Sequence, residues 1–366
     1  MHGDRLLLGP GPSAPYPEAV EALIRPTLGH LDPDYLALVG EIGDRLRAVF
    51  RTENALTLPV SGTGSAGMEA CLASLLEPGE TVIVGVNGYF GERLCQVAHR
   101  GGARVVRVEA PWGTALDPAD LLAAQRDNPQ AAMLAVVAAE TSTGVRNDVA
   151  PLGPELAQTD TLLLVDAVTA LGGSPLEVDG WQIDACYSAS QKCLGAPSGL
   201  APVTLGQRAV AKMHARTTPI HSFYLDLGLL HDYYLTSPPV YHHTASSTLA
   251  SALHAGLGRL LDEGVEQVWE RHARIGALLQ SALPELGFTL VAAENARLPQ
   301  LTAALLPDDL GDVAARKRLL TDYGIEVGGG LGEFAGRAWR IGLMGHAATE
   351  RSVVTLLGAV RELLKI

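Results

Sequence analysis

The sequence is poor in positive charge, in cysteine and in long apolar runs. Its 366 residues hold 27 Lys and Arg against 40 Asp and Glu, and this net charge of −13 argues against nucleic acid or an anionic membrane surface as a partner. No apolar run approaches the ~18 residues that a membrane-spanning helix needs. The few cysteines lack metal-ligand spacing, which predicts reduced thiols in a cytoplasmic protein; they are Cys71, Cys95, Cys186 and Cys193.

The apolar pattern predicts an α/β protein. Between residues 55 and 205, short apolar runs alternate with helix-like segments, which is typical of a doubly wound, mostly parallel sheet. Beyond residue 244, helical patterns mix with fewer strand-like runs, which predicts an α+β region. The expected strands are residues 55–60, 81–86, 103–107, 132–138, 161–166, 183–187, 201–205, 301–306, 324–327 and 338–343, and the expected helices are 17–25, 35–50, 245–262, 265–283, 312–322 and 349–364.

Length and composition divide the chain further. A chain of 366 residues exceeds the usual size of a single domain. We therefore expect a large domain over residues 16–263 and a smaller C-terminal α+β domain over 264–366. Residues 1–15 are rich in Gly and Pro, so we expect an N-terminal arm without regular structure that lies over a surface.

One lysine has an unusual sequence environment. Lys192 follows the strand-like run 183–187 and is surrounded by small or uncharged residues. Poor hydration would lower its pKa and prepare the amine to attack a carbonyl carbon. The alternative is a loop lysine that reaches back to water.

Asp166 ends the apolar run 161–166, which is typical of a strand buried on both faces. Ligands of open α/β sheets bind outside the carboxyl ends of the strands, so Asp166 would face a ligand; otherwise it caps the next helix. A carboxylate and an amine at two strand ends suit pyridoxal phosphate, which needs one for its ring nitrogen and the other for its aldehyde.

These motifs resemble the fold-type I, class V pyridoxal-phosphate aminotransferases, and within them the alanine–glyoxylate and serine–pyruvate branch. The resemblance runs nearly from end to end. It rests on residues 6–13, Val165-Asp166, Ser190-Gln191-Lys192, Tyr241-His242-His243-Thr244 and Arg340-Ile341-Gly342-Leu343. It implies a catalytic role for both Lys192 and Asp166, and an N-terminal arm that packs on a partner subunit near the active site.

A glycine-rich stretch follows the run 55–60. Residues 62–67 match the G-x-G-x-x-G spacing of dinucleotide sites, but the next strand-like run ends in Gly85-Val86-Asn87-Gly88 without the acidic residue that would hold a ribose. Glycines also let backbone amides and a helix N-terminus approach any phosphate. The resemblance places the cofactor phosphate here, with Gly64 and Ser65 as donors; relatives often carry histidine where Ser65 stands.

The resemblance implies further contacts with the cofactor ring. Phe90 would stack on one face, which the scarcity of aromatic residues and the nearby glycines favour over a core role. Val168 would cover the other face. Thr141 would bond near the phenolic oxygen or the substrate, although its hydroxyl could simply cap a turn.

Two more motifs concern the partner subunit and the substrate. The resemblance implies a homodimer with shared active sites, in which Tyr241 and Thr244 donate to the phosphate of the neighbouring subunit and Gln191 completes the shell. No Cys or carboxylate lies at zinc-site spacing from the adjacent histidines, so no metal is expected. Arg340 would hold the substrate carboxylate in a bidentate pair, although a surface salt bridge is the plainer alternative.

The sequence therefore predicts an aminotransferase that moves an amino group from alanine or serine to glyoxylate or pyruvate by a ping-pong mechanism. 2-Aminoethylphosphonate–pyruvate transaminase, another class V enzyme and a non-catalytic cofactor-binding subunit remain alternatives. Cysteine desulfurase is disfavoured, because its chemistry needs a cysteine in the small domain and none follows Cys193.

Overall fold

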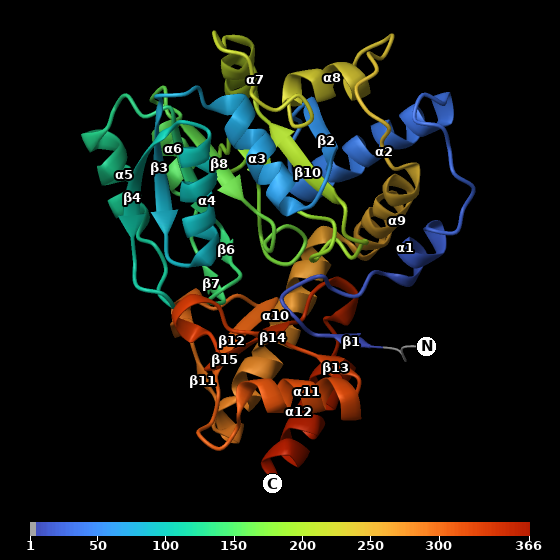
Figure 1. Cartoon of the computed structure of the whole chain (residues 1–366), viewed down its shortest axis with the longest axis vertical. Helices are drawn as coiled ribbons and strands as arrows, with labels where there is room; N and C mark the ends of the chain where they lie inside the picture. Colours follow the sequence, from blue (N-terminus) through green and yellow to red (C-terminus); the bar gives the residue numbers. More distant parts are fainter. Residues whose placement is uncertain (1–4) are drawn as a thin grey trace.

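The computed structural model describes residues 5–366 and is built on a sheet of seven strands (Figure 1). In spatial order these are β2 (Leu56–Ser61), β10 (Leu200–Leu205), β9 (Ala185–Tyr187), β8 (Leu162–Asp166), β5 (Met133–Val137), β3 (Thr81–Val86) and β4 (Arg104–Glu109). Strand β10 runs antiparallel to both of its neighbours, and the other pairings are parallel. The predicted mostly parallel sheet is thus confirmed, with its strands close to the expected runs.

The continuous apolar runs are explained by burial on both faces of the sheet. Along β8, Leu162 and Leu164 pack in one core cluster while Leu163 and Val165 pack in another, since side chains alternate across a strand. One cluster lies under α3 (Gly64–Leu75) and α4 (Tyr89–Arg100), and the other under α2 (Pro33–Phe50) and α9 (Ser247–Glu263).

The remaining helices connect or cover these strands. They are α1 (Pro17–Ala22), α5 (Pro118–Asp127), α6 (Leu152–Leu156), α7 (Gln207–His214) and α8 (Leu227–Leu235), followed in the C-terminal part by α10 (Val265–Ala282), α11 (Asp312–Asp322) and α12 (Glu350–Leu364). Side-chain caps start several of them; the Asp32 carboxylate, for example, accepts the Asp34 N–H at 2.9 Å at the start of α2. Within residues 5–366, no helix is long and apolar enough to span a bilayer.

A second, antiparallel sheet lies in the C-terminal part of the chain. Its order is β11 (Thr289–Leu290), β12 (Leu301–Leu305), β15 (Ala338–Gly342) and β14 (Gly328–Gly329). Gly264, with φ +93°, separates α9 from α10. Helix α10 joins the two cores, since Val265 and Val268 pack in the core of the large sheet while Ile275 and Leu279 pack in that of the small one. The domain boundary after residue 263 stays a prediction.

The N-terminal arm corrects one expectation. Leu6–Leu7 form the short strand β1, which pairs in parallel with β13 (Ile325–Glu326), whereas no regular structure was expected before residue 16. The reason is burial: Leu8 is fully buried in the core of the small sheet, so the backbone beside it needs partners. The described part of the arm packs on its own chain; residues 1–4 of the expected arm lie outside the described residues.

Candidate active site

Lys192 lies in the turn that follows β9 and is covered by the N-terminal arm. Its side chain is 8 % exposed, and its Nζ donates to the backbone oxygen of Pro10. The Ser13 hydroxyl donates to the Lys192 carbonyl at 2.8 Å and fixes the arm to this turn. Burial lowers the pKa of Lys192 to about 8, and the nearby Arg340 charge acts in the same direction. The lysine therefore does not reach back to bulk water.

Asp166 lies at the carboxyl end of β8, buried beside Lys192. Its Oδ2 accepts from the Tyr187 hydroxyl at 2.7 Å, and its Oδ1 accepts from the Val168 N–H at 2.9 Å. Burial raises the pKa of Asp166, while these two donors and the charges of Lys192 and Arg93 oppose that rise. The segment after β8 forms turns and not a helix, so Asp166 does not act as a helix cap. The carboxylate is thus held by neutral donors and can still accept from a cationic N–H.

The glycine-rich loop that follows β2 brings the start of α3 against the turn that follows Asp166. Helix α3 begins at Gly64 without a side-chain cap, so its first backbone N–H groups are available to an anion. A Cβ on Gly64 would lie 2.8 Å from the Val168 Cγ2 and 3.1 Å from the Ala189 Cβ. Only glycine permits this approach, which places the α3 N-terminus next to Val168 and next to the turn that carries Lys192.

Phe90 and Thr141 come from neighbouring segments. Phe90, partly buried, is the second residue of α4, and Thr141 follows β6 (Ala139–Glu140), which forms a small hairpin with β7 (Val145–Arg146). The hydroxyls of Thr141 and Thr169 are 2.6 Å apart in the buried interior. This hydrogen bond places Thr141 beside the turn that follows Asp166.

Sequence reasoning missed Glu140, which joins these segments. Its buried carboxylate accepts the N–H groups of Phe90 at 3.1 Å and Gly91 at 3.2 Å, and the Ser142 hydroxyl at 2.6 Å. Burial raises the pKa of Glu140, and these donors oppose the rise. The carboxylate fixes the start of α4, where negative charge is also favoured by the helix dipole. The sequence marks Glu140 only as an acidic residue shortly after an apolar run, and its N–H partners lie in a distant segment.

Arg340 approaches the site from the small sheet. It lies in the middle of β15, partly buried, and its Nε donates to the Gly329 oxygen at 2.8 Å. Burial lowers the pKa of Arg340 to about 10; the Glu140 charge opposes this and the Arg316 charge adds to it. The guanidinium is half-buried near Lys192 and is held by one carbonyl, so it does not form the surface salt bridge considered above. It keeps N–H groups that can bind a ligand.

The remaining predicted residues divide into two groups. Gln191 is at the site: its carbonyl accepts the Ser13 N–H at 2.9 Å, and its buried side-chain oxygen has no hydrogen-bond partner among residues 5–366. Tyr241 and Thr244 are not brought to Lys192 of their own chain. Both are exposed, and the Tyr241 ring lies 5.3 Å from the His30 ring.

The two histidines between Tyr241 and Thr244 are buried and bonded to their own subunit. His242 Nδ1 lies 2.8 Å from His243 Nδ1, and His243 Nε2 lies 2.6 Å from the Ser61 hydroxyl. Burial and the neighbouring His242 lower the pKa of His243 to about 4, so it is neutral at pH 7. In the part of the chain that the structure describes, no cluster of His, Cys, Asp and Glu is arranged to hold a metal ion.

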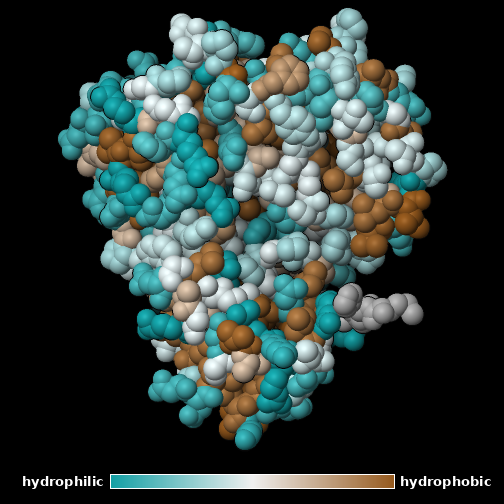
Figure 2. All heavy atoms as spheres, in the orientation of Figure 1, coloured by the Kyte–Doolittle hydropathy of each residue, from teal (hydrophilic) through white to brown (hydrophobic). Residues whose placement is uncertain are grey.

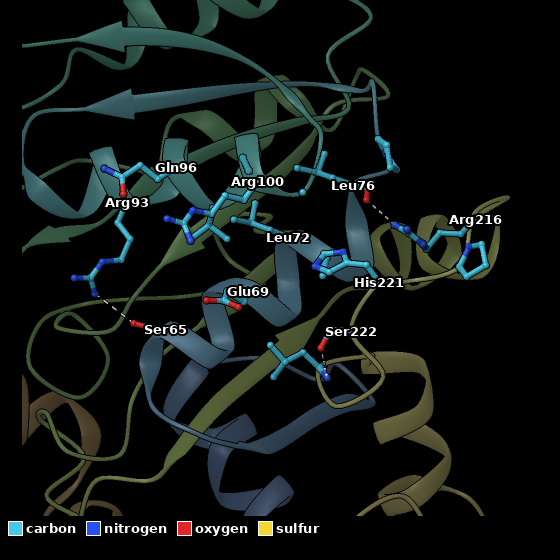
Figure 3. Close-up of a pocket in the computed structure, with 17 residues that line it drawn as sticks. Ser65, Glu69, Leu72, Leu76, Arg93, Gln96, Arg100, Arg216, His221 and Ser222 are labelled. Atoms are coloured by element: carbon cyan, nitrogen blue, oxygen red, sulfur yellow. Dashed lines mark hydrogen bonds between the residues drawn. The ribbon is translucent and has the colours of Figure 1, made fainter.

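A cavity of about 510 Å³ opens beside the N-terminus of α3 (Figure 3). It lies between α3, α4 and the segment 216–225, and Ser65 and Arg93 line the end nearest the α3 N-terminus. Exposed apolar side chains also occur outside the cavity, including Val240, Tyr241, Phe223 and, over α1, Val20 and Ile24. Figure 2 shows an apolar patch over α1, besides other apolar areas on the same face.

The chain is similar to known proteins of one family over nearly its whole length. Residues 16–336 match the family described as "Aminotransferase class-V". The chain is 34 % identical to (S)-ureidoglycine–glyoxylate transaminase of Bacillus subtilis, over 98 % of this chain and 90 % of that protein. It is 37 % identical to alanine–glyoxylate aminotransferase of Oryctolagus cuniculus, over 99 % and 93 %. The crystal structure of alanine–glyoxylate aminotransferase from Nostoc sp. superposes with a TM-score of 0.96 at 44 % identity, covering 100 % of this chain and 96 % of that one.

Proposed function

The chain belongs to the class-V aminotransferase family and is a transaminase of the fold-type I architecture, and on that premise we propose that it uses pyridoxal phosphate to move an amino group from alanine or serine to glyoxylate or pyruvate. The observation that carries this proposal is the convergence of three charged side chains. Lys192 follows β9, Asp166 ends β8 and Arg340 lies on β15. Burial lowers the pKa of Lys192 most, and the charges of Arg340 and Asp166 are close enough to act on it as well.

The residues present fit the cofactor. The buried Gln191 amide lacks a partner for its oxygen among the described residues, and rotation of the amide can offer N–H donors to a phosphate instead. Gly64 and Ser65 would donate from the start of α3. Phe90 and Val168 would lie against the two ring faces, with Thr141 near the phenolic oxygen.

The mechanism divides the chemistry between the cofactor and the chain. Bound pyridoxal phosphate supplies an electron-withdrawing ring that stabilises negative charge at the donor Cα. Lys192, whose pKa near 8 leaves part of the amine neutral at pH 7, removes the Cα proton as general base and holds it as an ammonium. Asp166 would lie at the ring nitrogen of the bound cofactor and would hold a proton there. Arg340 binds and orients the substrate carboxylate.

The arm supports a donor with a small side chain. A Cβ on Gly11 would lie 2.6 Å from the Lys192 Nζ, and Pro10 contacts the same amine through its carbonyl. Backbone therefore covers one side of the reacting amine, which favours small substrates such as alanine, serine and glyoxylate. The relatives named above act on glyoxylate, according to their names.

A homodimer with shared sites is part of the same proposal. His243 is bonded to Ser61, and His242 to His243 and to the Phe223 carbonyl, so the backbone between Tyr241 and Thr244 is held in place. The side chains of Tyr241 and Thr244 are exposed. Exposed apolar side chains at Phe223, Val240 and Tyr241 suit burial against a second copy. The partner's Tyr241 and the partner's Thr244 would then complete the phosphate shell at Gly64 and Gln191.

The test is an assay of the purified protein, loaded with pyridoxal phosphate, against a panel of donors and acceptors. We expect L-alanine with glyoxylate to yield pyruvate and glycine, and L-serine to act as a second donor. The panel includes 2-aminoethylphosphonate, which lacks the carboxylate that Arg340 would bind. Turnover of 2-aminoethylphosphonate in preference to alanine would overturn the substrate assignment, and lack of turnover with every donor would overturn the proposal.

A further inference from the structure

The proposed phosphate site has no assigned cation. A phosphate monoester carries close to two negative charges at neutral pH, yet the donors proposed so far are the backbone of Gly64, the hydroxyl of Ser65, the amide of Gln191 and the hydroxyls of a second subunit. All of these are neutral. A helix N-terminus offers only about half a positive charge. A dianion held there therefore lacks a countercharge.

Arg93 is placed to supply that charge. Figure 3 shows its side chain extending from α4 towards Ser65 at the start of α3, and its Nη1 donates to the Ser65 hydroxyl at 3.3 Å. Within residues 5–366, no carboxylate pairs with this guanidinium. Burial raises the pKa of Asp166, and the charge of Arg93 is one of the influences that oppose this rise. The cation thus lies at the start of α3, where the phosphate is proposed to bind.

The guanidinium is held in this place by its own helix. Its carbon lies 5.2 Å from the centre of the Tyr89 ring and 5.0 Å from that of Phe90, both in the first turn of α4. Such cation–π contacts orient a guanidinium while leaving its N–H groups free in the plane. Glu140 in turn fixes that first turn through the N–H groups of Phe90 and Gly91. Arg93 is therefore pre-positioned before any ligand binds.

We infer that Arg93 pairs with the phosphate of the cofactor, through the N–H groups directed at Ser65. The inference rests on the proposed function, because it needs a phosphorylated cofactor at the α3 N-terminus. A guanidinium matches a phosphate with two parallel hydrogen bonds, a geometry that a lysine ammonium lacks. Arg93 is thus a cofactor-binding residue that carries the main positive charge of the phosphate shell.

The experiment compares two ligands of the apoprotein that differ only in the phosphate. Dissociation constants for pyridoxal phosphate and for pyridoxal are measured by absorbance titration in the unmutated protein, in R93Q and in R93K. R93Q should raise the dissociation constant for pyridoxal phosphate about tenfold to a hundredfold, because a charged hydrogen bond is lost. The dissociation constant for pyridoxal should not change. R93K keeps the charge and should lose less affinity for pyridoxal phosphate than R93Q does. The matched control is R100Q, since Arg100 lies on the same helix and lines the same cavity but is exposed.

Each outcome is decisive. Equal weakening of both ligands in R93Q would mean that Arg93 supports the fold or Phe90, and unchanged affinity for both would mean that the phosphate needs no countercharge; either result overturns the inference. If R93Q does not fold, R93K decides: it should lose affinity for pyridoxal phosphate alone, and a loss common to both ligands overturns the inference. Failure of the unmutated protein to bind either ligand would refute the proposed function itself, and the role of Arg93 with it.

Discussion

Replacing Lys192 with methionine should make the apoprotein more stable at pH 7 while it abolishes amino transfer. Burial lowers the pKa of Lys192 from 10.5 to about 8, and at about 1.4 kcal/mol per pH unit this corresponds to roughly 3 kcal/mol by which the folded state disfavours the charged amine. Methionine fills similar space without a charge. It loses the hydrogen bond to the Pro10 oxygen, worth about 1 kcal/mol, so the expected net gain is about 2 kcal/mol.

The gain should depend on pH in a defined direction. Below pH 8 the amine is charged in both the folded and the unfolded chain, so the unmutated protein carries the whole penalty. Between about pH 8 and 10.5 the folded chain holds a neutral amine while the unfolded chain remains protonated, so the penalty fades as the pH rises. Above 10.5 both are neutral. The advantage of K192M should therefore shrink to zero across this window and then reverse slightly, because the Pro10 contact remains only in the unmutated protein.

Urea denaturation of both apoproteins, followed by circular dichroism at several pH values and at equal protein concentration, measures this difference. K212M is the control. Its lysine pairs with Glu80 at 2.6 Å near the surface, and the substitution should not stabilise the protein. A K192M protein that is no more stable than the unmutated one at pH 7, or whose advantage persists unchanged at pH 10.5, would refute the argument from burial.

Three further predictions concern the reaction. Asp166→Asn should retain the cofactor, seen in its absorbance, but lose most of kcat, because a neutral amide cannot hold the ring-nitrogen proton; a near-normal kcat would leave Asp166 a structural role only. Mixing Lys192→Ala chains with Tyr241→Phe/Thr244→Ala chains should restore about a quarter of the sites by random pairing; mixtures no more active than their parents would contradict shared sites. Arg340→Lys should raise the KM for alanine and glyoxylate about tenfold or more, since a bidentate pair is lost; unchanged KM values would place the carboxylate elsewhere.

The positions of Asp166 and Lys192 could be predicted because their signal is local. Each follows an apolar run whose residues pack on both faces of the sheet, and the ends of parallel strands share one edge. The contact between Tyr187 and Asp166 was harder to predict. The sequence pattern is typical of a core residue at Tyr187, but a buried tyrosine needs a hydrogen-bond partner for its hydroxyl, and Asp166 lies directly opposite on the neighbouring strand.

The remaining contacts could not be predicted because they join distant segments. Glu140 accepts from backbone N–H groups some fifty residues earlier, and no periodicity in either segment encodes that pairing. Strand β1 is only two residues long and meets its partner at the other end of the chain. The sequence did not indicate a binding role for Arg93 either, because a basic residue in an amphipathic helix normally faces water.

The pairing of Leu6 with Ile325 has a consequence for biosynthesis. A chain emerging from the ribosome folds from its N-terminus onward, but here the first strand must wait for nearly the last one before it can dock. Until then the arm is tied to the Lys192 turn only through Ser13 and Tyr16, and the stretch with Pro10 and Gly11 is held at one end. Completion of the C-terminal segment thus anchors the other end of the backbone that covers the lysine.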